Sequence, residues 1–235
     1  MTANENSYRL KVLVACEESQ QMCIAFRKQG CIAFSCDIQD CSGGHSEWHI
    51  KGDCLPLLNG NCCFVTSDGK EHELNGTWDL IIAHPPCTYM SKAGARWMYP
   101  TAGNIDPKRL RLALEAREFF FKIINADCPH IAVENPRPLK VINLPPQSQV
   151  IQPYQFGHPY SKATCLWLKN LPNLIPTNIV DVYSPFLPSN TGGKKRGQKH
   201  SHGVAHNAKD ASKTFEGIAN AAATQWCQWV LSRSR

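Results

Sequence analysis

Short apolar runs bounded by turn residues recur along the chain, a pattern typical of strands buried within a parallel sheet. The clearest runs lie at residues 11–15, 31–36, 78–84, 130–136 and 162–168. Helical repeats of apolar residues separate them and lie at 18–28, 107–125 and 213–231. A polar stretch, 60–76, predicts a hairpin or loop insertion. Together they predict one α/β domain over residues 1–235, with an open, mostly parallel sheet flanked by helices.

The run at 78–84 is followed by Pro85, Pro86 and Cys87. Two prolines fix the backbone and remove two donors, so the chain should leave the sheet as a stiff turn that presents Cys87. A thiol held in this way is a candidate nucleophile. The alternative is an inert cysteine buried under a loop.

A second reactive group, Glu134, ends the run at 130–136. Ligands of open parallel sheets bind beyond the carboxyl ends of the strands, so Cys87 and Glu134 are expected in one crevice. The alternative for Glu134 is an exposed charge at the end of a strand.

Two further acidic positions favour a nucleoside cofactor. Asp37 ends the second run, where folds of this kind bind ribose hydroxyls. Gly52 and Asp53 follow a short strand expected at 48–51 and would face the same crevice. Capping of a local turn is the alternative at both places.

The composition is that of a globular protein, with 43% hydrophobic and 19% charged residues. No apolar run approaches the ~20 residues that span a bilayer, and the polar N-terminus lacks a signal-peptide pattern. We therefore expect a cytoplasmic protein without membrane contact. Separately, we favour a monomer. The twelve cysteines are expected to be reduced. A zinc site is the alternative for the densest cluster, which comprises Cys36, Cys41, His45, His49 and Cys54.

The net charge of +6 favours a polyanionic partner. Much of the excess lies in a basic loop at 192–203, and phosphate contact would suit it. A solvated surface loop is the alternative. The loop belongs to a wider basic, loop-rich insertion at 170–212.

Taken in order, these segments resemble the DNA cytosine-C5 methyltransferases, specifically their short phage and prophage members. Residues 79–91 resemble the family's nucleophile segment with its Pro-Cys pair, and 134–136 resemble its Glu-Asn-Val segment. Asp37, Gly52-Asp53 and the segment 217–220 match weaker motifs in the same order. The likeness spans most of the chain and implies a Rossmann-like, S-adenosylmethionine-dependent methyltransferase fold, with 170–212 in place of a full target-recognition domain. It also implies a bacterial or phage-infected host cytoplasm.

The resemblance implies roles for particular residues. Cys87 would add to C6 of cytosine and Glu134 would protonate or hydrogen-bond N3. S-adenosylmethionine would be held by Ala15, Glu17, Glu18, Asp37, Ile38, Gly52, Asp53, Pro85 and Asn220. DNA would be contacted by Ser91, Arg96, Lys194, Lys195, Arg196 and Lys199. No metal is implied.

Two departures from the family pattern stand out. The first loop, Val14 to Ser19, has none of the glycines that let a cofactor approach the backbone. An arginine that helps to hold the base is replaced by Lys162 or Thr164, and lysine lacks the planar fork of arginine.

Three other functions stay open. The same fold and nucleophile would also serve to transfer a modified group, such as carboxymethyl, from an altered sulfonium donor. A Pro-Pro-Cys thiol also resembles thymidylate synthase and its relatives, which act on free nucleotides, although the order of motifs favours the methyltransferases. A DNA-binding protein that has lost catalysis is the non-enzymatic alternative.

Overall fold

The computed structural model describes residues 8–186 and 212–233. A seven-stranded sheet forms the centre of the molecule, in the order β3-β2-β1-β6-β7-β10-β8. Its strands, in chain order, are β1 (Lys11–Ala15), β2 (Ile32–Asp37), β3 (His49–Lys51), β6 (Leu80–Ala83), β7 (Ile131–Pro136), β8 (Gln149–Ile151) and β10 (Thr164–Lys169).

The pairing of the strands places the topological switch point of the sheet between β1 and β6. β3, β2, β1, β6 and β7 are parallel neighbours, while β10 runs antiparallel to both β7 and β8. The chain builds outward from β1 to β3 and then, in the other direction, from β6 to β7. The adjacent strands β1 and β6 are therefore the switch point of a doubly wound sheet, where ligands bind beyond the carboxyl ends.

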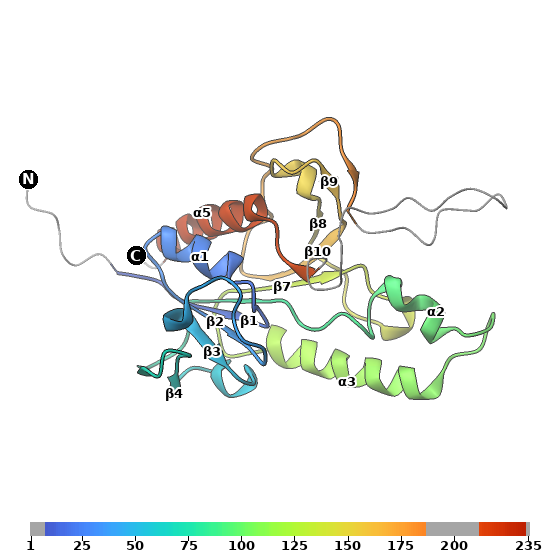
Figure 1. Cartoon of the computed structure of the whole chain (residues 1–235), viewed down its shortest axis with the longest axis horizontal. Helices are drawn as coiled ribbons and strands as arrows, with labels where there is room; N and C mark the ends of the chain where they lie inside the picture. The colour runs from blue at the N-terminus through green and yellow to red at the C-terminus, as the bar shows by residue number, and fades with distance from the viewer. Residues whose placement is uncertain (1–7, 187–211, 234–235) are drawn as a thin grey trace, which may run out of the picture.

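Helices cover both faces of the sheet (Figure 1), which confirms the predicted α/β architecture. α1 (Gln21–Lys28) and α5 (Glu216–Arg233) pack on one face, and α3 (Pro107–Ile124) packs on the other. Alternate residues of β1 face the two layers. Val12 and Val14 join the core under α1 and α5, and Leu13 joins the core that includes α3.

Smaller elements complete the described chain. β4 (Cys62–Val65) and β5 (Glu71–Leu74) form the hairpin that the polar stretch predicts. α2 (Ala95–Met98) is a single turn after the Cys87 segment, and β9 (Tyr160–Ser161) pairs with β11 (Ser184–Pro185). Short 3-10 turns lie at Ser46–Trp48, Leu55–Leu57, Lys92–Gly94, Lys140–Ile142 and Pro153–Gln155.

α1 begins three residues later than the sequence predicts, because the first loop holds the backbone otherwise. Cys16 and Gln20 have φ angles of 59° and 60°, in the left-handed region that glycine usually occupies. The Gln20 side chain anchors this geometry, since its amide accepts from the His45 N–H and donates to the His45 carbonyl. The loop thus takes glycine-like conformations without containing a glycine.

No helix within the described ranges is long and apolar enough to cross a membrane.

Candidate active site

The segments that follow β6 and β7 are hydrogen-bonded to each other, which brings the ends of both strands into one site. The Asn135 side-chain amide donates to the Pro85 carbonyl at 2.9 Å. Farther on, the Leu139 N–H donates to the Met90 carbonyl at 2.8 Å, and the Lys92 N–H donates to the Arg137 carbonyl at 2.9 Å. The stiff turn predicted from the two prolines is therefore braced by the segment that carries Glu134.

Cys87 lies half-buried in this braced turn, and its carbonyl accepts from the N–H groups of Met90 and Ser91. Burial and the charge of Glu134 raise the pKa of the Cys87 thiol, while the positive charge of Lys162 lowers it. Cys87 and Glu134 are thus within electrostatic range of each other, as expected for one crevice. The raised pKa favours the thiol over the thiolate.

Glu134 forms an ion pair with His84, the last residue before the two prolines. Its Oε2 lies 3.0 Å from the His84 Nδ1, and the two side chains are only 19% and 11% exposed. Burial alone would raise the pKa of Glu134, but the hydrogen bond and charge of His84, together with Lys162, lower it overall. Burial likewise disfavours the imidazolium, yet Glu134 and Glu17 outweigh it and raise the pKa of His84.

Lys162 supplies a third charged group. It precedes β10, and its backbone N–H donates to the Gln152 side chain at 2.9 Å. Burial lowers the pKa of its ammonium, while the charges of Glu134 and Cys87 act in the opposite direction. Lys162 and Thr164 are the two residues predicted to replace an arginine. Thr164 is buried and its hydroxyl donates to the Lys162 carbonyl. Lys162 is therefore the one that can place a cation beside Glu134. Glu134, Lys162 and Thr164 line a small enclosed cavity at the start of α5.

Glu17 occupies the loop after β1, on the other side of His84. Its carboxylate accepts the N–H groups of Met22 and Cys23 at 2.6 and 3.2 Å, in the first turn of α1. Burial nevertheless raises the pKa of Glu17 above its ordinary value, against the charge of His84. The neighbouring Glu18 is buried as well, and Ala15 is the fully buried last residue of β1.

The predicted nucleoside-binding acids lie at the carboxyl ends of β2 and β3. Asp37 Oδ1 accepts from the Gln39 N–H at 2.9 Å, and Asp53 Oδ1 accepts from the Leu55 N–H at 3.0 Å. Both carboxylates therefore cap turns, as the alternative held, while the Oδ2 atom of each makes no hydrogen bond to the described residues. Gly52 ties the two ends together through its N–H, which donates to the Asp37 carbonyl at 2.9 Å.

Two further cofactor predictions lie on exposed positions. Ile38 is 76% exposed beside Asp37, and Asn220 is exposed on α5, away from the residues that pack on α1. No contact within the described ranges brings Asn220 to the other cofactor residues.

The DNA-contact predictions divide into three groups. Ser91 is 3% exposed and forms a bridge with Pro138, so its burial argues against a direct contact with DNA. Arg96 is exposed and its guanidinium lies 4.6 Å from the ring centre of Trp97. The remaining residues lie outside the described ranges, namely Lys194, Lys195, Arg196 and Lys199.

The zinc alternative has no support in the described parts of the chain. No group of three or more His, Cys, Asp or Glu side chains there is arranged to hold a metal. Both ring nitrogens of His49 are already engaged, with the Ser35 hydroxyl and the Gln39 carbonyl.

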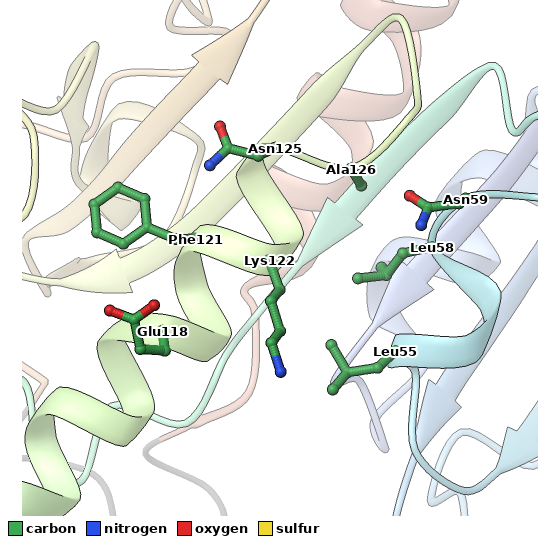
Figure 2. A pocket seen from close by; sticks show the side chains of 8 residues that line it. All are labelled: Leu55, Leu58, Asn59, Glu118, Phe121, Lys122, Asn125 and Ala126. Carbon is green, nitrogen blue, oxygen red and sulfur yellow. The ribbon is translucent and has the colours of Figure 1, made fainter.

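A hollow of about 480 Å³ lies elsewhere, between the turn at Leu55–Leu57 and the last turns of α3 (Figure 2). Its lining is shared by apolar and polar side chains such as Phe121, Lys122 and Asn59. None of the residues predicted to be catalytic or cofactor-binding lines it. The predicted site residues therefore lie at the strand ends and not in this hollow.

His84 is the site residue that the sequence analysis missed. A polar side chain that ends a run of buried residues, directly before Pro-Pro-Cys, was the available indication.

Comparison with models of known families finds no match, and comparison with curated proteins finds no significant match.

Proposed function

We propose that this protein is a DNA cytosine-C5 methyltransferase that uses S-adenosylmethionine. The observation that carries the proposal is the meeting of Cys87, Glu134 and Lys162 beyond the carboxyl ends of the strands, with Asp37 and Asp53 at the same edge. A nucleophile, an acid and a cation beside nucleoside-binding carboxylates are what this reaction needs.

The order of the strands supports a nucleoside donor. The succession β3-β2-β1-β6-β7 corresponds to the 3-2-1-4-5 order of dinucleotide-binding sheets. The free carboxylate oxygens of Asp37 and Asp53 fit ribose hydroxyls and an amino group, and the exposed Ile38 fits the apolar face of a purine. Bound S-adenosylmethionine would supply an electrophilic methyl group on a sulfonium.

Each of these side chains has its own role in the proposed reaction. Cys87 first gives its thiol proton to solvent. Its thiolate then adds to C6 and N3 takes a proton from Glu134, so that C5 becomes an enamine carbon. C5 then bonds to the methyl carbon while the sulfonium sulfur keeps the electron pair of the broken bond. Loss of the C5 proton to solvent and rupture of the C6–S bond return the electron pair to Cys87.

A basic surface beside the site supports DNA as the substrate. The segments 88–112 and 137–140 contain seven basic residues and one acidic residue. The exposed ones include Lys92, Arg96, Arg137 and Lys140, and the backbone bond between Lys92 and Arg137 holds two of them together. Cytosine within a duplex would have to flip out to reach Cys87, and phosphate contacts offset part of that cost.

The direct test is methyl transfer to DNA. The protein is incubated with S-adenosylmethionine carrying a labelled methyl group and duplexes of varied sequence, and 5-methylcytosine is quantified after digestion. We expect label in wild type and in Cys63→Ser, which alters an exposed cysteine of the hairpin, and none in Cys87→Ser. Label on another base, or full activity of Cys87→Ser, would refute the proposal.

A further inference from the structure

His84 connects the end of β6 to both neighbouring strands, β1 and β7. Its backbone N–H donates to the Ala15 carbonyl at 3.0 Å, which continues the pairing of β6 with β1. Its Nδ1 lies 3.0 Å from Glu134 on β7, and the charge of Glu17 acts on it from the loop after β1. The His84 backbone is thus fixed to β1, its imidazole is hydrogen-bonded to β7, and two acidic groups act on its charge.

The charges around His84 determine where a proton resides. Glu134 and Glu17 favour the imidazolium, while burial and the ammonium of Lys162 disfavour it. The buried 3.0 Å hydrogen bond between His84 Nδ1 and Glu134 Oε2 holds a proton between the two groups. The raised pKa of His84 and the lowered pKa of Glu134 favour that proton on the imidazole.

One feature of His84 favours release of that proton. Its Nε2 is buried and has no hydrogen-bond partner among the described residues. In the imidazolium this unpaired Nε2–H belongs to a buried cation, and an unpaired charged donor costs more than the neutral N–H that remains once Nδ1 has given up its proton. Loss of the Nδ1 proton therefore relieves part of that cost.

The proposed reaction needs a proton at Glu134, whereas the hydrogen-bonded pair favours that proton on His84. We infer that His84 is a positioning residue that stores this proton, passes it to Glu134 as Glu134 protonates N3, and takes it back when the adduct breaks down. This inference rests on the proposed function and deepens it.

The transfers balance. As the C6–S bond forms, Nδ1–H of His84 gives its proton to Oε2 of Glu134, and Glu134 gives a proton to N3 of the base. His84 changes from cation to neutral, Glu134 is an anion before and after, and the thiolate charge is consumed in the new bond. When the C6–S bond breaks, the N3 proton returns through Glu134 to His84 and Cys87 leaves as a thiolate.

The test uses His84→Asn, whose side-chain amide can donate one hydrogen bond to Glu134 and cannot store a proton. His130→Asn is the matched control, because His130 is a half-buried histidine before β7 that bonds the Asp79 carbonyl. Single-turnover adduct formation on duplexes containing 5-fluorocytosine is followed against pH, and DNA affinity is measured in parallel.

We expect His84→Asn to slow adduct formation about a hundredfold at pH 6.5. In the wild type the rate should rise with the thiolate fraction of Cys87 and level off above the raised pKa of His84, whereas in His84→Asn it should keep rising with pH. DNA affinity should change less than about threefold, and His130→Asn should match the wild type. A His84→Asn profile that superimposes on the wild type would overturn the inference and leave the methyltransferase proposal standing. Absence of any wild-type adduct would instead overturn both.

A second measurement does not depend on turnover. The ring protons of His84, assigned by their absence from spectra of His84→Asn, are titrated by NMR in the wild type and in Glu134→Gln. The inference requires a raised pKa that falls in Glu134→Gln. An unchanged titration would show that the two groups do not share a proton.

Discussion

The acidity of Cys87 depends on two neighbours of opposite charge. Glu134 raises the pKa of the thiol and Lys162 lowers it. We predict that Glu134→Gln speeds alkylation of Cys87 by iodoacetamide at pH 8, and that Lys162→Met slows it, each by roughly three- to tenfold. Peptide mass spectrometry separates Cys87 from the other eleven cysteines. Equal rates in the two variants would contradict the arrangement of charges.

The His84–Glu134 pair also makes stability depend on pH. Because the folded state raises the pKa of His84, its charged form contributes stability that is fully present below the ordinary value near 6.5 and is lost as pH rises through the folded value. Removal of a hydrogen bond to a charged group costs about 2 kcal/mol. Urea unfolding should therefore show His84→Ala destabilised by about that amount at pH 6 and by less at pH 9. A difference that grows with pH would be inconsistent with the pair.

At this scale the sequence indicated that Cys87 and Glu134 lie close together but missed His84, which is hydrogen-bonded to Glu134. Cys87 and Glu134 could be identified because each follows a recognisable strand and precedes or accompanies proline. His84 could not, since its role depends on the register that sets β6 beside β7. The left-handed backbone of Cys16 was equally hidden, because no glycine marks it.

Among the elements, α5 depends on Gly217. A Cβ at this position would lie 1.8 Å from the Phe156 carbonyl oxygen, and the Gly217 N–H donates to His158 at 2.9 Å. We predict that Gly217→Ala destabilises the protein by more than about 2 kcal/mol in urea unfolding, despite the higher helix propensity of alanine. Ala222→Gly, within the same helix, is the comparison variant, because it lowers helix propensity and removes a buried methyl group. A Gly217→Ala protein as stable as the wild type would show that α5 begins elsewhere.

The elements themselves were largely predictable. Strands β1, β2, β6 and β7 and helix α3 lie within a few residues of the predicted positions, since their apolar patterns are strong and their ends carry Gly or Pro. The antiparallel direction of β10 was not predictable, because strand direction depends on the path of the connecting loop. The late start of α1 depends on the Glu17 carboxylate, which bonds amides that a local pattern does not reveal.

For the molecule as a whole, the basic surface should govern binding to DNA. Each phosphate contact contributes roughly −0.9 to the slope of log K against log salt concentration. Replacing Lys92, Arg96 and Arg137 together by Gln should reduce the magnitude of that slope by about 2 to 3. Lys122→Gln, at the far end of α3, is the control and should leave it unchanged. A slope that is equal in all three proteins would place the DNA elsewhere.

The most direct measurement is the intact mass of the protein after incubation with S-adenosylmethionine and duplex DNA containing 5-fluorocytosine. Fluorine at C5 cannot leave as a proton does, so the enzyme should stall with Cys87 bonded to C6. The account predicts an adduct that carries one added methyl group in the wild type and in Cys63→Ser, and no adduct in Cys87→Ser. An adduct with a different added mass would indicate another donor, and the absence of an adduct on all duplexes tested would contradict the account.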